Sequence, residues 1–223
     1  MVKPRIPETE DGIQGEFDVE TYDTFMRGMR NRGWLETKDI IKAGITSGLA
    51  LELGPGPGYL GLEWLKNTSG SRLKGLDISQ NMIKIAQRNS KEYGFSDDRA
   101  EYIEGDASEI PFADAAFDAV FSNGSLHEWA RPEAIIEQIN RVLKPGGKYC
   151  LSDMKRNMNP LVKSFLGLMT RPRQIRPYLT SSINAAYTKD ELVELLSRTS
   201  LTGWQIAESP FGLVVSGVKT TVL

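Results

Sequence analysis

The chain has 223 residues, of which 40% are hydrophobic and 25% are charged, and its formal net charge is −2. This composition is typical of a globular protein with one sizeable core, and the nearly balanced charge excludes a general attraction to nucleic acid or to anionic membranes. Cys150 is the only cysteine, which excludes an intrachain disulfide and a cysteine-rich metal centre. We therefore expect no metal site, no transmembrane segment and a cytoplasmic location.

The first 45 residues predict a lead-in followed by capping helices. Residues 1–20 are rich in proline, glycine and acids, a composition that is typical of a poorly ordered segment. Two short helical patterns follow, at about 21–31 and 35–43.

Residues 46–154 alternate between strand and helix patterns and predict the cofactor-binding core. Strands are expected at 47–53, 71–77, 100–104, 116–122 and 147–153, and helices at 57–68, 80–93 and 131–143. Such alternation indicates a parallel sheet with helices on both faces. The Lys144-Pro145-Gly146-Gly147 run predicts a helix stop and a turn before the last of these strands.

Residues 155–187 interrupt the alternation and predict an inserted lid over the substrate. The segment contains no acid, and its apolar residues recur at roughly helical spacing. Its basic residues are Lys155, Arg156, Lys163, Arg171, Arg173 and Arg176. We expect Arg171, Arg173 and Arg176 to contact an anionic substrate; the alternative is a solvated basic face with an apolar core stripe.

Residues 188–223 are expected to complete the core. Thr188 and Glu191 have the spacing of a capping box, which predicts a helix from there to about residue 199. Two strands at about 203–208 and 213–219 follow, and their short connection predicts an antiparallel hairpin.

A glycine-rich turn after the first strand of the core indicates an adenosine-containing cofactor. Gly54, Gly56 and Gly58 allow the backbone to approach a ligand closely, and Asp77, at the end of the next strand, supplies acceptors for a ribose. The dinucleotide fingerprint would need a third glycine at the position of Tyr59.

The acid before the turn distinguishes between cofactors. Glu52 would repel a pyrophosphate but suits a cation. S-adenosylmethionine, which carries an ammonium and a sulfonium and no phosphate, is therefore the expected cofactor. The alternative for Glu52 is a solvated acid at the end of a strand.

The order of several motifs resembles the class I S-adenosylmethionine-dependent methyltransferases, and among them the group that includes the ubiquinone and menaquinone C-methyltransferases. The resemblance runs from about Leu49 to Asp153. Its segments begin with the turn at 51–58 and continue through 75–79, 105–107, 110–112, 117–122, 126–129 and 141–147. It implies a Rossmann-like α/β fold with a seven-stranded sheet in the order 3-2-1-4-5-7-6, of which the last strand is antiparallel.

The resemblance also implies a cofactor site. The three glycines would lie under the methionine part and the ribose, Glu52 near the ammonium and Asp77 on the ribose hydroxyls. The adenine would lie among Ile78, Met82, Asp106 and Ala107, although Met82 has an alternative role in the core. Tyr22 in the first helix and Asn123 after the fourth strand complete the expected cofactor set.

His127 is the only histidine of the chain and follows the fourth strand, so it is the candidate general base for methyl transfer. Its alternative role is to shape the loop, together with Glu128 and Trp129. The run Ser122-Asn123-Gly124-Ser125 replaces the Asn-Pro-Pro-Tyr type of motif, which disfavours an exocyclic amine of a nucleic acid as acceptor.

We therefore expect a methyltransferase that acts on a small molecule, anionic or partly apolar. Two alternatives come from other classes: an RNA or DNA methyltransferase that binds through residues 155–187, and a non-catalytic cofactor-binding subunit. The sequence does not define the methylated atom or the oligomeric state.

Overall fold

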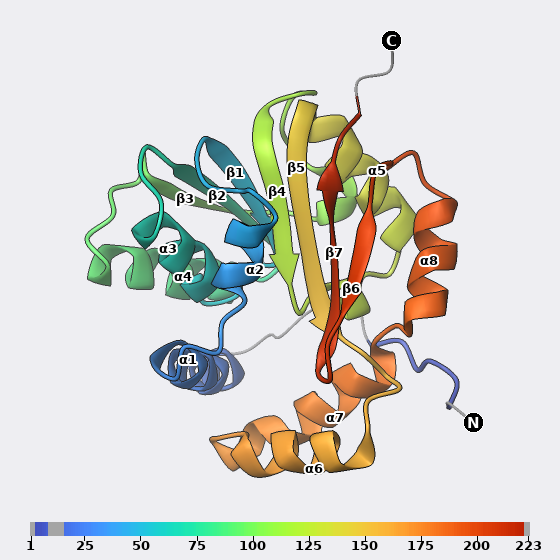
Figure 1. Ribbon diagram of the computed structural model, residues 1–223. Coiled ribbons are helices and arrows are strands. Elements are labelled where there is room, and N and C mark those ends of the chain that lie inside the picture. Colours follow the sequence, from blue (N-terminus) through green and yellow to red (C-terminus); the bar gives the residue numbers. More distant parts are fainter. Residues whose placement is uncertain (1–2, 9–15, 221–223) are drawn as a thin grey trace.

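The computed structural model describes residues 3–8 and 16–220, and its centre is one sheet of seven strands (Figure 1). In chain order these strands are β1 (Leu49–Leu53), β2 (Arg72–Asp77), β3 (Ala100–Glu104), β4 (Phe117–Asn123), β5 (Leu143–Met154), β6 (Gln205–Glu208) and β7 (Gly212–Val218). Their spatial order is β3-β2-β1-β4-β5-β7-β6. The first five are parallel, and β7 is antiparallel to β5 and β6. The fold class and the strand order expected from the sequence are confirmed.

The helices cover both faces of this sheet and its lower edge in Figure 1. In chain order they are α1 (Glu16–Asn31), α2 (Thr37–Lys42), α3 (Tyr59–Lys66), α4 (Gln80–Glu92), α5 (Pro132–Val142), α6 (Pro160–Met169), α7 (Arg176–Ala185) and α8 (Lys189–Ser197). Short 3-10 turns lie at η1 (Ala107–Glu109), η2 (Leu126–Glu128) and η3 (Arg173–Ile175).

Alternating side chains of the central strands divide the core into two layers. In β1, Leu51 and Leu53 pack with α5 and α8, whereas Ala50 faces the layer formed with α2, α3 and α4. All three side chains are fully buried. Because successive side chains of a strand point to opposite faces, a strand covered by helices on both sides is apolar throughout. Glu52 interrupts this pattern, and it is buried as well.

The boundaries of several helices and strands differ from the predicted ones, for reasons that lie in the local sequence. Helix α3 begins at Tyr59, two residues later than expected, because Gly58 before it has a left-handed φ of 83°. Strand β5 begins at Leu143 and includes the predicted helix stop, with an irregular register between Phe117 and Ala119 of β4. Helix α8 begins with the expected capping box of Thr188 and Glu191.

The amino-terminal segment differs from the expected poorly ordered lead-in. Helix α1 already begins at Glu16, and residues 3–8 are attached to α7 and η2. The amide of Ile6 donates to the carbonyl of Asn184 at 3.2 Å, and the Arg5 guanidinium donates to the carbonyls of Ala185 at 2.6 Å and His127 at 2.9 Å. Residues 1–2 and 9–15 of the predicted lead-in lie outside the described residues.

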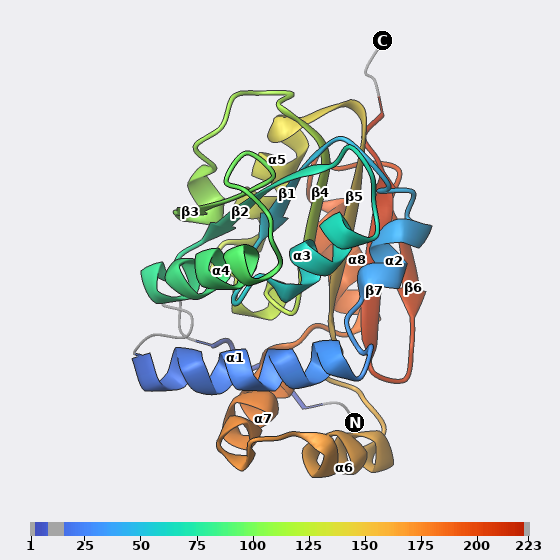
Figure 2. The same ribbon diagram turned by 90° about the vertical axis from the view of Figure 1, so that its left-hand side faces the viewer.

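Three helices lie at the edge of the sheet where the parallel strands end. Figure 2 shows α1 directly below the sheet, with α7 and then α6 farther out, whereas in Figure 1 α1 lies below α3 and α4, and α7 and α6 lie below β5 and β7. The predicted lid at residues 155–187 thus consists of α6, η3 and α7. Among the described residues, no helix is both long enough and apolar enough to span a membrane.

Candidate active site

A cleft lies at the carboxyl ends of β1 and β4, where the chain passes from one half of the sheet to the other. Ligands bind at such switch points in open α/β sheets. The predicted residues that line it are Tyr22, Glu52, Gly54, Gly56, Asp77, Ile78, Met82, Asp106, Ala107 and Asn123. The predicted residues that do not line it are Gly58, His127, Arg171, Arg173 and Arg176.

The glycine turn between β1 and α3 forms the floor of the cleft. Gly54 and Gly56 have φ angles of 65° and 51°, in the left-handed region that favours glycine. A side chain at Gly54 would place its Cβ only 2.8 Å from the Cβ of Ser125. At Gly58 an added Cβ would lie 2.8 Å from the Tyr102 hydroxyl, so this glycine serves packing against β3 rather than the cleft surface.

Asp77 connects the glycine turn to the start of α4. Its carboxylate accepts hydrogen bonds from the amides of Gly56 and Ser79, both at 2.9 Å. Burial raises the pKa of Asp77, and the two amides partly oppose this effect. Two amides leave acceptor positions free on a carboxylate, so Asp77 can still bind hydroxyl groups of a ligand in the cleft.

Carboxylates dominate the polar lining of the cleft. Of the described residues that line it, four are acids, namely Glu52, Asp77, Asp106 and Glu128, and Arg131 is the only cation. The Arg131 guanidinium lies 3.8 Å from the Asp106 carboxylate. The cleft therefore has an excess of negative charge and favours a cationic ligand.

Two of these acids are costly to ionise without a cation. Burial raises the pKa of Glu52 to about 8, with the Gly61 amide opposing and the Asp77 charge adding to the shift. One Glu52 carboxylate oxygen is buried and accepts no hydrogen bond from the described residues. Burial also raises the pKa of Glu128 to about 7, although the nearby His127 charge opposes it. An entering cation would stabilise both carboxylates.

The expected adenine neighbours lie along one side of the cleft. Ile78 is 45% exposed, as expected for the wall of an open cleft, whereas Met82 is buried beside Val19 and Ile85. Met82 thus both lines the cleft and packs in the core, which combines its two predicted roles. The Asp106 carboxylate accepts from the Ser108 amide at 2.7 Å.

Helix α1 closes the cleft through Tyr22 and Met26, which both line it. The helix is anchored by the buried Asp23, whose carboxylate accepts from the Tyr59 hydroxyl at 3.0 Å and the Asn89 amide at 2.8 Å. Burial raises the pKa of the Tyr22 phenol, and the charges of Glu128 and Asp77 add to this shift. Sequence reasoning missed Asp23, because one acid on an amphipathic helix carries no distinguishing signal.

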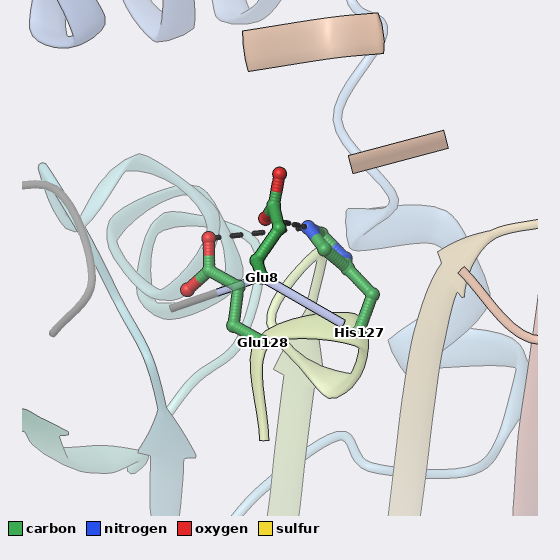
Figure 3. A group of neighbouring side chains, drawn as sticks. All are labelled: Glu8, His127 and Glu128. Carbon is green, nitrogen blue, oxygen red and sulfur yellow. Dashed lines mark ion pairs between the residues drawn. The ribbon is translucent and has the colours of Figure 1, made fainter. Parts of the chain in front are cut away.

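His127 lies behind the cleft, in a cluster of carboxylates. Its Nδ1 is 2.8 Å from Asp153 Oδ1, and its Nε2 is 3.4 Å from Glu8 Oε2 and 3.9 Å from Glu128 Oε1. Figure 3 shows the Glu8 and Glu128 carboxylates converging on the imidazole. Asp153 also accepts from the His127 backbone amide at 2.8 Å, which fixes the ring. Sequence reasoning did not find Glu8 and Asp153, which come from distant parts of the chain.

These carboxylates favour the charged imidazolium. Burial lowers the pKa of His127, but the Asp153 charge and hydrogen bond, together with Glu8, outweigh it and raise the pKa to about 10. A general base must be neutral at the working pH, so this arrangement suits the alternative, positioning role. Glu8, His127 and Glu128 have ligand atoms within 4.8 Å of one another and could hold a metal ion. The imidazolium proton already supplies a compensating positive charge there.

The three predicted substrate arginines do not line the cleft. Arg171 and Arg173 are exposed and Arg176 is partly buried. The Arg171 guanidinium donates to the carbonyls of Leu168 at 2.8 Å and Thr170 at 3.0 Å. A contact between these residues and a substrate remains a prediction.

Comparison with known proteins connects this cleft to a domain family. The family described as "Methyltransferase domain" matches residues 51–151. An uncharacterized methyltransferase of Bacillus subtilis, YdaC, is 36% identical over 118 residues, which cover 52% of this chain and 62% of that protein. A demethylmenaquinone methyltransferase of Clavibacter sepedonicus is 30% identical over 129 residues, which cover 52% of this chain and 51% of that protein. The aligned part is thus less than two thirds of either relative.

A solved structure shares the whole fold. A putative S-adenosyl-L-methionine-dependent methyltransferase from Methanococcus maripaludis superimposes with a TM-score of 0.77 and 22% identity, covering 99% of each chain.

Proposed function

Because residues 51–151 are a methyltransferase domain, we propose that the protein transfers a methyl group from S-adenosylmethionine to a small molecule that binds beside Glu128. The resemblance to the S-adenosylmethionine-dependent methyltransferases is confirmed by this match, and with it the expected enzyme class and cofactor. The acceptor and the residues that bind each ligand are proposals.

The observation that carries the proposal is the charge of the cleft. Four acids and one arginine line it, and the glycine turn leaves room for close backbone contact. A sulfonium with an ammonium group would relieve the cost of ionising Glu52, while the free acceptor positions of Asp77 suit a ribose. A phosphate-bearing cofactor would instead meet repulsion from Asp77 and Asp106 and would raise the cost of ionising Glu52 further.

The protein's contribution to the chemistry is alignment and exclusion of water. When bound, the cofactor supplies an activated methyl group, and the transfer breaks a carbon–sulfur bond whose electron pair stays on sulfur. The acceptor must therefore approach in line with that bond. Tyr22 and Met26 of α1 line the cleft, and Glu128, with a pKa raised to about 7, is placed to accept a proton from an acceptor hydroxyl.

The class of acceptor follows from the neighbours of Glu128. Trp129, Ala130 and Ile135 line the same part of the cleft, so we propose an acceptor with an apolar body. Such an acceptor agrees with the name of the Clavibacter sepedonicus relative, a demethylmenaquinone methyltransferase. The nucleic-acid alternative is not favoured, because Arg171, Arg173 and Arg176 do not line the cleft.

The test is transfer of label from methyl-labelled S-adenosylmethionine to a metabolite extract, followed by identification of the labelled product by mass spectrometry. We expect label in a compound with an apolar ring or chain. Asp77→Ala serves as a control, since it should strongly reduce labelling at a cofactor concentration that just saturates the wild type. Label in RNA, or equal labelling by the variant, would contradict the proposal.

A further inference from the structure

Helix α6 presents an apolar face to solvent. Leu161, Phe165 and Leu168 are 80%, 47% and 58% exposed, and their spacing of four and three residues places them on one side of the helix. No residue of α6 is buried, so the helix does not use this face to join the core. A contiguous group of exposed large apolar side chains usually marks a contact surface.

Basic residues flank this apolar face. Arg171 and Arg173 follow α6 directly and are exposed, and within residues 3–8 and 16–220 neither forms an ion pair with an acid. The whole segment from 155 to 187 contains no acid. Three other cations of the segment are engaged: Lys155 pairs with Glu208 at 2.7 Å, the buried Arg156 pairs with Glu191, and Lys163 donates to the Arg156 carbonyl at 2.9 Å.

The position of α6 relates this surface to the cleft. In both ribbon views α6 is the outermost element at the edge of the sheet where the parallel strands end, and the cleft lies at that same edge (Figures 1 and 2). A flat partner that contacted α6 would therefore lie at the same end of the protein as the cleft.

We propose that α6, with Arg171 and Arg173, docks the protein on the surface of a membrane that contains anionic lipids. Apolar side chains of an interfacial helix enter the boundary between headgroups and acyl chains, and adjacent cations bind the lipid phosphates. The combination of the two signals selects this partner. An apolar protein surface would not need the free arginines, and a nucleic acid would not need Leu161, Phe165 and Leu168. This inference goes beyond the proposed function and does not depend on it.

Sedimentation of the full chain with sucrose-loaded vesicles tests the proposal. We expect binding to vesicles with 30% phosphatidylglycerol, weak binding to pure phosphatidylcholine, and release at 0.5 M salt. Phe165→Ser should weaken binding about tenfold or more. The double variant Arg171→Gln/Arg173→Gln should weaken it about thirtyfold, which corresponds to about 1 kcal/mol for each charge.

Matched controls lie at the opposite edge of the sheet. Val218 at the end of β7 is 43% exposed, so Val218→Ser removes a similar apolar surface and should leave binding unchanged. Lys66→Gln/Arg72→Gln removes the same charge from exposed positions at that edge and should reduce binding less than threefold.

Three results would overturn the proposal. One is no sedimentation of the wild type with anionic vesicles. Another is equal loss of binding in the control variants. The third is a wild-type dimer that Phe165→Ser converts to a monomer without any vesicle binding, which would make this face a protein contact.

Discussion

Replacing Glu52 by glutamine tests the electrostatics of the cleft at its most deeply buried acid. Burial raises the pKa of Glu52 from 4.5 to about 8, a difference that corresponds to about 4–5 kcal/mol. Since the folded-state pKa is above the unfolded one, Glu52 stabilises the fold fully only below its unfolded pKa. This contribution is lost as the pH rises through about 8. At pH 9 the unliganded Glu52→Gln protein should therefore be more stable than the wild type. The gain in the free energy of unfolding should be at most about 4–5 kcal/mol.

Cofactor binding should reverse the order of stability of the Glu52→Gln protein and the wild type. At pH 7 about nine in ten wild-type molecules carry a protonated Glu52 in the empty cleft, and a cation must displace that proton. Glu128, with a pKa of about 7, adds about half a proton more. We expect S-adenosylmethionine binding to release more than one proton at pH 7. The Glu52→Gln protein should bind more weakly and release only the contribution of Glu128.

Two measurements check this prediction. Calorimetric titration in buffers of different ionisation enthalpy gives the number of protons released, and chemical denaturation at pH 6 and pH 9 gives the free energy of unfolding. Glu128→Gln is the matched control, because it removes an acid of the same cleft with a smaller pKa shift. Proton release by Glu52→Gln equal to that of the wild type, or no gain in stability at pH 9, would refute the reasoning.

Three further changes have defined outcomes. Asp77→Ala should weaken S-adenosylhomocysteine binding about a hundredfold or more, and a change of less than about threefold in calorimetry would remove the ribose assignment. His127 has a pKa raised to about 10, so the wild type should lose stability between pH 6.5 and 10. In His127→Gln the melting temperature should be lower at pH 6 and should fall less over that range; an unchanged profile would contradict an imidazolium there. Gly54→Ala should lower the melting temperature more than Gly70→Ala, because both glycines have positive φ but only Gly54 meets a neighbour, 2.8 Å away; equal losses would show that backbone strain alone matters.

Much of the fold was predictable from the sequence because its signals are local. The strand and helix periods, the glycine turn and the capping box of Thr188 and Glu191 each depend on residues within one element. The order of the motifs then predicted the strand order of the sheet, because the methyltransferases that the motifs resemble share one strand order. The wrong predictions concern the boundaries of elements. Strand β5, for example, begins at Leu143 and therefore includes the segment that was predicted to be a helix stop and a turn.

The surroundings of His127 could not be predicted in the same way. Asp153 is 26 positions away and Glu8 comes from the amino-terminal segment, so neither forms a spacing pattern with the histidine. The exposure of α6 was equally hidden, because Leu161, Phe165 and Leu168 have the same spacing as a core stripe. Periodicity shows that a helix has an apolar face, whereas only the tertiary structure shows whether that face is covered.

The attachment of residues 3–8 has a consequence for synthesis of the protein. Arg5 and Ala185 are 180 positions apart, so their hydrogen bond cannot form until most of the chain has left the ribosome. Any nascent or cleaved chain that ends before residue 185 lacks this contact. Protease resistance of the segment around Arg5 should therefore distinguish a completed chain from a truncated one, and a protein trimmed at the amino terminus to residue 16 would lose both Arg5 and Glu8.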